Sequence, residues 1–162
     1  MAEDLEASFV AYVAARRPAL IRLATLLCGD PHQAEDLVQG ALLKAVPRWR
    51  RLREDPEPWL RRVMVNDHIS AWRRHRGREQ LVDAVPERAA TAAREPDADL
   101  RDALARLAPK QRAVVVMRYY CDLTEVETAR VLGVSVGTVK SQHSDALARL
   151  RGVLPGAVES SR

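Results

Sequence analysis

Residues 123–150 read LTEVETARVLGVSVGTVKSQHSDALARL, a pattern typical of two helices joined by a tight turn. Thr124 can cap the first helix, and Glu127 completes a capping box three residues later. Gly133 can form the turn, because a left-handed backbone strains residues with a side chain. Ser135 can cap the second helix. One apolar face is predicted on each helix, and the two faces should pack together: Leu123, Val126, Ala129 and Leu132 against Val136, Val139, Ala146, Leu147 and Leu150.

The second of these helices leaves mainly short polar side chains facing outward. Such side chains suit hydrogen bonds to base edges and phosphates, as in a helix-turn-helix whose second helix enters the major groove. The same pattern also fits an ordinary antiparallel helix pair. The glycine turn, both caps and the polar outward set together favour DNA binding. The outward residues are Thr138, Lys140, Ser141, Gln142, Ser144 and Asp145.

The 162 residues carry a formal net charge of only +4, but the charge is unevenly distributed. Arg61–Arg78 is strongly basic, Glu79–Asp102 is acidic, and Ala103–Arg151 is basic again. Two basic blocks separated by an acidic one suggest two modules that face nucleic acid and a linker between them. Solvated helix faces would explain any single block, but they explain this alternation less well.

Several classes of protein are disfavoured by the composition. The two cysteines, Cys28 and Cys121, lie far apart and indicate buried thiols in a reducing compartment. No signal peptide or membrane span is visible, so we expect a cytoplasmic protein without membrane insertion. Its four histidines are scattered and no phosphate-binding glycine loop is present. We therefore expect no enzyme activity, no cofactor and no metal site.

The N-terminal part is predicted to be a helical module. A helix over Leu5–Cys28 should be kinked or broken at Pro18. Gly29 should end it, Asp30 should cap the next helix, and that helix should run from Pro31 to about residue 46. Its apolar stripe is regular, yet one leucine lies off it, which suggests a surface meant to be covered. The stripe comprises Ala34, Leu37, Val38, Ala41, Leu42 and Ala45, and the off-stripe residue is Leu43.

A basic loop and a further helix follow. Arg48–Pro58 is predicted to be a loop, and the helix should begin at Trp59 with Leu60, Val63, Met64 and Ile69 on its inner side. Arginines bind phosphate, and an asparagine can pair with an adenine edge. A solvated basic helix is the simpler alternative, but the neighbouring basic loop favours DNA. The outward residues of this helix include Arg61, Arg62, Asn66, Arg73, Arg74 and Arg76.

The remaining segments complete an all-α architecture of two small helical domains. Residues 5–76 form the first domain, residues 77–98 an acidic flexible linker, and residues 99–154 the second domain. A short helix over Asp99–Leu107 is followed by one that Pro109 opens. Apolar residues of this last helix should pack on the helix-turn-helix: Val114, Val115, Met117 and Tyr120.

Three stretches give the sequence a family resemblance. DLVQGALLKA (36–45), WLRRVMVN (59–66) and KQRAVVVMRYYCDLTEVETARVLGVSVGTVKSQ (110–142) resemble an extracytoplasmic-function sigma factor of the sigma-70 family. The chain is most similar to the SigE-like actinobacterial-type group. The helix-turn-helix alone would also fit a response-regulator output domain, so the first two stretches decide the resemblance.

The resemblance implies a role for each domain. The first domain would bind the β′ clamp helices of core RNA polymerase through Asp36, Gln39 and Leu43. It would also recognise and melt the −10 element, with a pocket in the 50–57 loop for an extruded base. The second domain would read the −35 element and bind the β flap, and an anti-sigma factor is possible. The implied −10 residues are Arg50, Leu52, Arg53, Arg61, Arg62, Asn66 and Arg73, and the −35 residues are Ser135, Thr138, Lys140, Ser141, Gln142 and Ser144.

Three residues depart from the family's pattern. Gly40 stands where an acidic residue is usual, Leu52 replaces an aromatic pocket residue, and Asp145 stands where arginine is frequent. The leading hypothesis remains a promoter-specificity subunit of RNA polymerase. The alternative is a free-standing dimeric helix-turn-helix regulator, which would need an apolar dimer interface and a two-fold symmetric operator.

Overall fold

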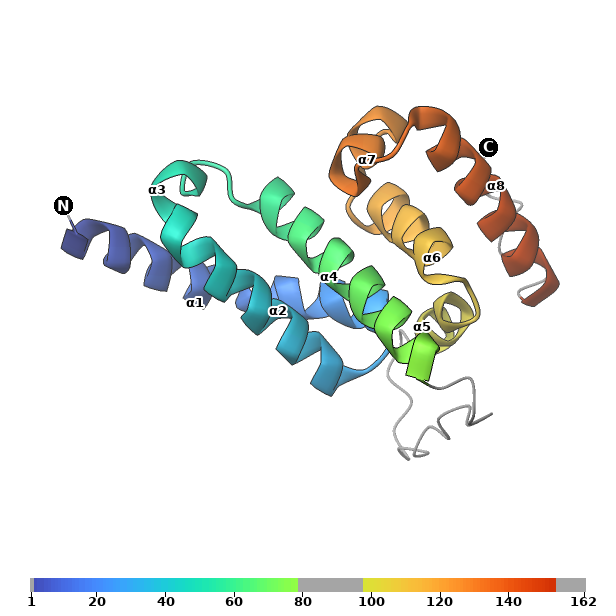
Figure 1. The fold of residues 1–162 in the computed structure, drawn as a ribbon, viewed down its shortest axis with the longest axis horizontal. Helices are drawn as coiled ribbons and strands as arrows, with labels where there is room; N and C mark the ends of the chain where they lie inside the picture. Colours follow the sequence, from blue (N-terminus) through green and yellow to red (C-terminus); the bar gives the residue numbers. More distant parts are fainter. Residues whose placement is uncertain (1, 79–97, 154–162) are drawn as a thin grey trace.

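The computed structural model describes residues 2–78 and 98–153, and every regular element in these ranges is a helix (Figure 1). The predicted all-α class is therefore confirmed. Most of the predicted linker lies outside the described residues. The first body contains α1 (Ala2–Cys28), α2 (Pro31–Ala45), the 3₁₀ turn η1 (Val46–Arg48), α3 (Trp49–Leu52) and α4 (Glu57–Arg78). The second contains α5 (Ala98–Ala105), α6 (Pro109–Val115), the π-helical turn η2 (Val116–Tyr120), α7 (Glu125–Leu132) and α8 (Val136–Val153).

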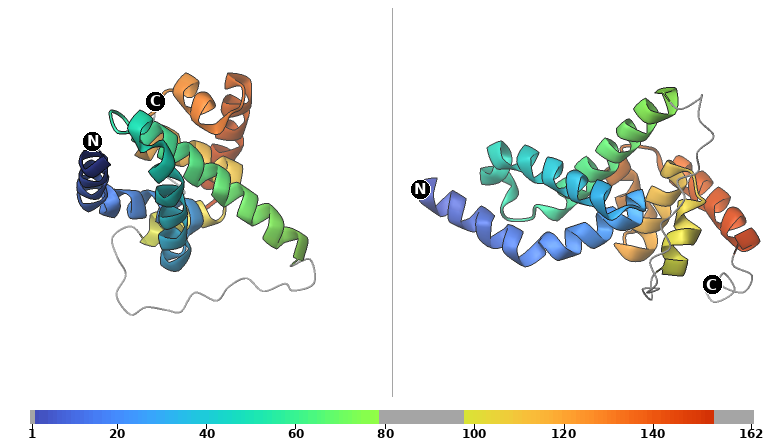
Figure 2. Two further views of the ribbon diagram at one scale, coloured as in Figure 1. Left: turned by 60° about the vertical axis from the view of Figure 1, so that its left-hand side comes forward. Right: turned by 90° about the horizontal axis from the view of Figure 1, so that it is seen from below.

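The junction of α1 and α2 is built as the sequence predicts. Gly29 has a positive φ of 78°, and the Asp30 carboxylate accepts a hydrogen bond from the backbone N–H of His32 at 3.0 Å. Pro31 occupies the first turn of α2, where its missing N–H costs nothing. Helix α1 continues through Pro18 and changes direction partway along its length (Figure 2). It is therefore bent and not broken.

The basic segment after α2 is partly helical, which corrects the prediction of a loop over residues 48–58. Trp49 starts the short helix α3 and is only 4 % exposed. Its ring packs edge-on against Phe9 at 5.1 Å, and its indole N–H donates to Ser8 Oγ at 2.8 Å. The segment is ordered because this tryptophan anchors it to the N-terminal half of α1, a contact made 40 residues away in sequence.

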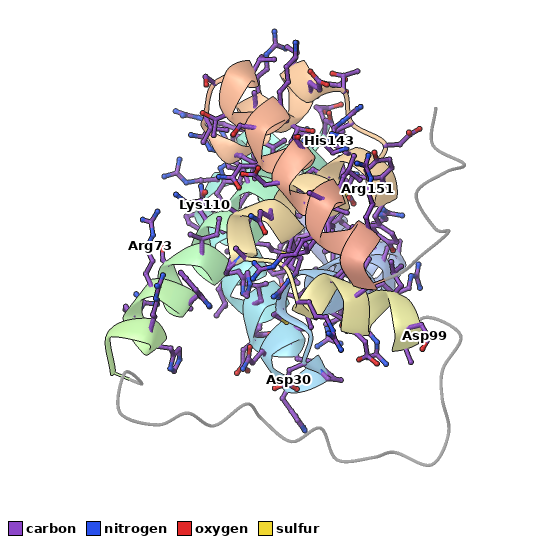
Figure 3. All side chains as sticks on the ribbon, turned by 90° about the vertical axis from the view of Figure 1, so that its right-hand side faces the viewer. Asp30, Arg73, Asp99, Lys110, His143 and Arg151 are labelled. Atoms are coloured by element: carbon purple, nitrogen blue, oxygen red, sulfur yellow. The ribbon has the colours of Figure 1, made fainter. Side chains whose placement is uncertain are left out.

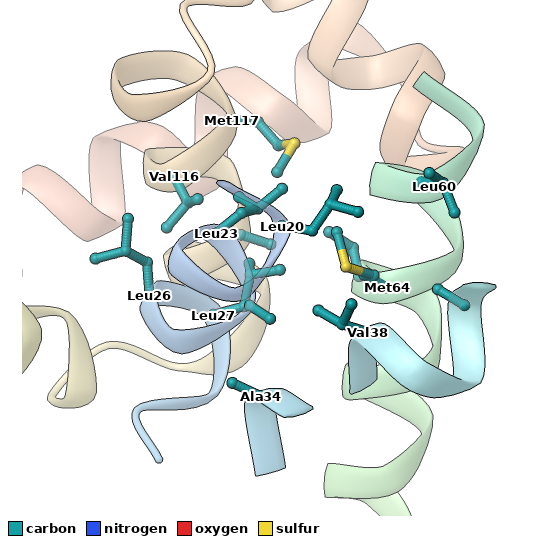
Figure 4. Packing of buried hydrophobic residues seen from close by; sticks show 14 of the residues in the cluster. Leu20, Leu23, Leu26, Leu27, Ala34, Val38, Leu60, Met64, Val116 and Met117 are labelled. Carbon is teal, nitrogen blue, oxygen red and sulfur yellow. The ribbon is translucent and has the colours of Figure 1, made fainter. Parts of the chain in front are cut away.

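The larger of two apolar clusters in the described residues runs through both bodies. Met117 and Val116 of η2 lie beside Leu20 and Leu23 of α1, as Figure 4 shows. Buried residues of α4, α5, α6, α7 and α8 belong to the same cluster, so α1 and α4 form one wall of the second body. The contact between α1 and η2 could not be predicted from the sequence. Hydrophobic periodicity indicates which residues each body can bury by itself, but not how the two bodies pack together.

The shared core explains which packing predictions failed. Val114 packs on Ala129 and Val139 of the helix-turn-helix, as predicted, but Tyr120 is exposed. Val115 and Met117 belong to the core that the two bodies share.

The apolar face predicted for α7 is also partly wrong. Val126 is 49 % exposed, and Val131 is buried in its place. Helix α7 contacts α4 of the first body as well as α8, and its buried face is rotated accordingly.

Candidate nucleic-acid interface

The helix-turn-helix has the predicted caps and turn. Thr124 Oγ1 accepts from the backbone N–H of Glu127 at 3.1 Å, and the Glu127 carboxylate accepts from the N–H of Thr124 at 2.7 Å. This backbone hydrogen bond holds the pKa of Glu127 below its usual value. Gly133 ends α7 with a left-handed φ of 67°, and Ser135 Oγ accepts from the N–H of Thr138 at 3.0 Å. Local sequence signals therefore fix where α8 begins and in which direction it runs.

Helix α8 presents the predicted polar surface. Val139 and Ala146 are fully buried on its inner side, as predicted. Lys140 lies 3.8 Å from Glu125, a long and exposed ion pair that contributes little and leaves the lysine available. The predicted outward residues lie at the surface, with Gln142 half-buried and the others exposed: Ser135, Thr138, Lys140, Ser141, Ser144 and Asp145.

One contact that orients α8 was missed by the sequence analysis. The hydroxyl of Tyr119 and Nε2 of His143 lie 2.7 Å apart, and the two rings stack with centroids 5.6 Å apart. Burial, followed by the charge of Arg118, lowers the pKa of His143. The contact ties the middle of α8 to η2 on the exposed side of the second body. Tyr119 and His143 are 24 residues apart, and no local pattern indicates their pairing.

The predicted polymerase-binding residues form one open face of α2. Asp36, Gln39 and Leu43 are all exposed and lie at helical spacing, with Leu43 63 % exposed. The next residue, Lys44, turns toward α4 and pairs with Asp67 at 2.9 Å. Helix α2 is thus held on α4 by one side, while the side that carries the three predicted residues faces solvent.

The segment predicted to hold an extruded base is only partly open. Arg50 and Arg53 are exposed, and Arg53 pairs with Asp4 at 3.2 Å. Leu52, the predicted pocket residue, is half-buried and packs against the core. The structure therefore places the two arginines at the surface, whereas the Leu52 side chain serves the packing of α3.

Behind this segment, Glu57 organises a partly exposed polar cluster at the start of α4. Its carboxylate accepts from Tyr12 Oη at 2.7 Å and from Arg16 Nε at 2.8 Å. Burial opposes the ionisation of Glu57, but these hydrogen bonds outweigh it and hold its pKa below the usual value. Burial and the same contact raise the pKa of Tyr12. The cluster fixes α1 to α4 beneath the basic segment.

The predicted promoter-facing residues of α4 divide into two groups. Asn66 and Arg73 are exposed. Arg61 is half-buried, and its charge acts on Cys121 of the second body. Arg62 reaches the turn of the helix-turn-helix, because a Cβ built on Gly133 would lie 3.9 Å from Arg62 Nη2. The first half of α4 therefore faces the second body.

A groove of about 650 Å³ separates the second half of α4 from the second body. Arg76 stacks on Trp72 along its α4 wall, with the guanidinium carbon 5.1 Å from the ring centroid. Arg73 and Lys110 lie on opposite walls and face the same side of the molecule (Figure 3). Gln142 and Asp145 of α8 also line it, so Arg73 and Gln142, predicted to read two different DNA elements, meet in one groove.

Residues 2–78 and 98–153 contain neither a membrane-spanning helix nor a metal-binding cluster. No helix there is long and apolar enough to span a membrane. No group of three or more histidine, cysteine or acidic side chains in those ranges could hold a metal ion.

The geometry defines a class of protein: a two-body helical protein with an exposed helix-turn-helix and a second, arginine-bearing helix. Comparison with known proteins identifies the family. Residues 12–78 match the family described as Sigma-70 region 2, and residues 97–150 match Sigma-70, region 4. The RNA polymerase sigma-E factor of Streptomyces coelicolor is 44 % identical over 156 residues, which cover 93 % of this chain and 87 % of that protein. The ECF RNA polymerase sigma factor SigM of Mycobacterium tuberculosis is 37 % identical over 139 residues, 83 % of this chain and 71 % of SigM.

Solved structures agree with this assignment. The sigma factor RpoE of Bartonella quintana, crystallised with the anti-sigma factor NepR, superimposes with a TM-score of 0.68 at 27 % identity. The match covers 92 % of this chain and 98 % of RpoE. The chain belongs to the sigma-70 family and is an extracytoplasmic-function RNA polymerase sigma factor. It directs promoter-specific initiation of transcription and is not itself an enzyme.

Proposed function

We propose that this sigma factor binds core RNA polymerase through the open face of α2. Asp36 and Gln39 would make polar contacts with the β′ clamp helices, and Leu43 would supply the apolar contact. The observation that supports this proposal is the exposure of Leu43, a large apolar side chain in a helix that otherwise buries its apolar stripe. Such a side chain gains free energy when a partner covers it.

The first body would then open the −10 element. Melting a duplex costs stacking energy, and an enzyme or factor offsets that cost when it holds an extruded base. Arg50 of α3 and Arg53 at its C-terminal end are exposed, where they can bind phosphates of the displaced strand. Asn66 and Arg73 lie on exposed parts of α4 and can contact bases or backbone. Arg61 and Arg62 join this set only if the second body moves away from α4.

The second body would read the −35 element in duplex form. The N-terminal end of α8 carries the exposed hydroxyls and Lys140, and its caps fix its direction. Side chains at this end of a recognition helix commonly contact base edges. Gln142 is the member of the set that faces the groove beside α4. The exposed surface near η2 would remain for the β flap.

The same proposal places the protein in the cytoplasm, where RNA polymerase acts, and under the control of an anti-sigma factor. RpoE of Bartonella quintana was crystallised with such a factor, NepR. Its likeness to this chain extends over both bodies, so an anti-sigma protein of comparable shape would find a similar surface here.

Reconstituted transcription tests the proposal. Purified chain is added to core RNA polymerase with a library of promoter fragments, and start sites are mapped. We expect initiation that depends on the chain and on both promoter elements. Gel filtration with and without core polymerase provides a second readout, in which a monomer that joins the polymerase supports the proposal. A dimer that ignores polymerase and binds a two-fold symmetric duplex would instead identify a free-standing regulator.

A further inference from the structure

The basic segment that runs from Trp49 to Glu57 is fastened to α1 at both of its ends. At its start, Trp49 donates its indole N–H to Ser8 Oγ at 2.8 Å. At its end, the Glu57 carboxylate accepts hydrogen bonds from Tyr12 Oη at 2.7 Å and from Arg16 Nε at 2.8 Å. All three partners lie on one helix, so the two ends of the segment are held against the same support.

Tyr12 is the residue that contacts both ends. Its ring lies 5.2 Å from the ring of Trp49, inclined at 50°, while its hydroxyl donates to Glu57. Tilted aromatic pairs at this distance are favourable, and a hydrogen bond to a carboxylate is stronger than one between neutral groups. One side chain therefore sets how far apart the start and the end of the segment lie.

The half of α1 that precedes Pro18 mainly supports this segment. The buried residues of α1 begin only at Leu20. Helix α3 lies alongside the preceding half (Figure 2). Four side chains of this half pair with residues 49–57 through hydrogen bonds or ion pairs: Asp4, Ser8, Tyr12 and Arg16. Removing one of these polar contacts should therefore alter the segment and leave the apolar core intact.

Between its two fixed ends the segment presents a basic surface. Arg50, Arg51 and Arg53 are exposed, whereas Pro56 is buried directly before Glu57. Exposed guanidinium groups bind phosphates. A segment that is ordered before it binds loses less conformational entropy on binding, which favours capture of a ligand. The arginines are thus presented on a support that is already in place.

We propose that Tyr12 is a positioning residue for the opening of the −10 element. By joining Trp49 to Glu57, it holds the basic segment in the shape that receives the displaced strand. This role rests on the proposed function, because the shape of the segment matters only if the segment captures melted DNA. The partners of Tyr12 do not include the exposed face of α2, so polymerase binding does not depend on this residue.

The test compares a fully paired promoter that the wild-type holoenzyme uses with the same promoter mismatched across the −10 element. Core polymerase is reconstituted with the full chain, and a 2-aminopurine in the displaced strand reports unstacking. Tyr12→Phe removes the hydroxyl and keeps the ring on Trp49. We expect the rate of opening on the paired template to fall about tenfold, which corresponds to ~1.4 kcal/mol. At saturating holoenzyme, initiation on the mismatched template should match the wild type, because capture no longer has to offset the cost of melting.

A second variant and a matched control test the same contact from its other side. Arg16→Met removes the second hydrogen bond to Glu57 and should also slow opening on the paired template alone. Arg17→Met is the control, because Arg17 is exposed at the next position of α1 and takes no part in the contacts to Trp49 or Glu57. It should open the paired template at the wild-type rate. Circular dichroism and urea unfolding establish that each variant is folded under the assay conditions.

Each outcome then decides one question. Opening at the wild-type rate in both folded variants would overturn the inference. An equal loss on the paired and the mismatched template would also overturn it, because Tyr12 would then act on a step other than melting. Should one variant fail to fold, the other decides. A chain that does not bind core polymerase, or a wild-type holoenzyme that initiates without unstacking the reporter at any −10 position, would refute the proposed function itself and the inference with it.

Discussion

Leu43→Ala is expected to weaken the binding of core RNA polymerase without changing the stability of the free protein. Leu43 is 63 % exposed, so most of its side chain remains available for a partner to cover. Full burial of a leucine contributes about 1.5–3 kcal/mol, and roughly 60 % of that is about 1–2 kcal/mol. The dissociation constant should therefore rise about 5- to 30-fold. The free energy of unfolding should stay within about 0.5 kcal/mol, as for other surface substitutions.

The assay is fluorescence titration of labelled sigma factor with core polymerase, paired with urea unfolding of each variant. Val10→Ala is the matched control, because Val10 is 58 % exposed on α1, outside the proposed polymerase face. We expect Val10→Ala to bind polymerase as the wild type does. An unchanged affinity in Leu43→Ala, or an equal loss in both variants, would refute the assignment of α2 as the polymerase-binding helix.

Four further predictions concern stability, pH and promoter reading. Gly40→Ala should raise the free energy of unfolding by about 0.5–1 kcal/mol, because a Cβ there meets no atom within 4 Å and glycine weakens a helix interior. Gly133→Ala should lower it by about 1–2 kcal/mol, because φ at this turn is 67°; urea unfolding measures both. The pKa of His68 is lowered to about 4, so between about pH 6.5 and 4 the unfolded chain takes up a proton that the folded chain does not. Stability should fall with decreasing pH across this window, by up to about 1.4 kcal/mol per pH unit, and His68→Gln should remove that part of the slope. Lys140→Ala and Ser141→Ala should each lower transcription from a −35-dependent promoter while polymerase affinity is retained. Each lost base contact should weaken binding of the −35 element by about 1–3 kcal/mol.

Matched comparisons make these predictions specific. The two glycine variants receive the same methyl group, so equal signs would contradict the backbone argument. His75→Gln alters an exposed histidine on the same helix and is the matched control for His68→Gln. Transcription that is unaltered in both α8 variants would remove Lys140 and Ser141 from the −35 set.

Features that depend on neighbouring residues could be predicted from the sequence. The cap at Asp30, the capping box at Thr124 and the turn at Gly133 each depend on residues no more than four positions apart. The open face of α2 follows from the helical spacing of its exposed residues. The outward side of α8 follows in the same way, because its buried residues recur at helical spacing.

Features that depend on distant parts of the chain could not be predicted. Trp49 makes its segment helical only because Phe9 and Ser8 receive its ring and its N–H. Val126 and Val131 both fit an amphipathic helix, and only the position of α4 decides which one is buried. Arg112 of α6 donates a hydrogen bond to the backbone carbonyl of Leu27, which lies 85 residues away in the sequence. Backbone acceptors of this kind leave no trace in side-chain patterns.

The apolar core that continues from α1 into η2 has a consequence for how this kind of protein can be recombined. Regions 2 and 4 match separate families, which suggests that either region could be exchanged between sigma factors as an independent domain. In this chain each region supplies part of the other's interior. A hybrid with a foreign region 4 would carry mismatched side chains at that junction. It should melt in two steps in a calorimeter, where the parent melts in one.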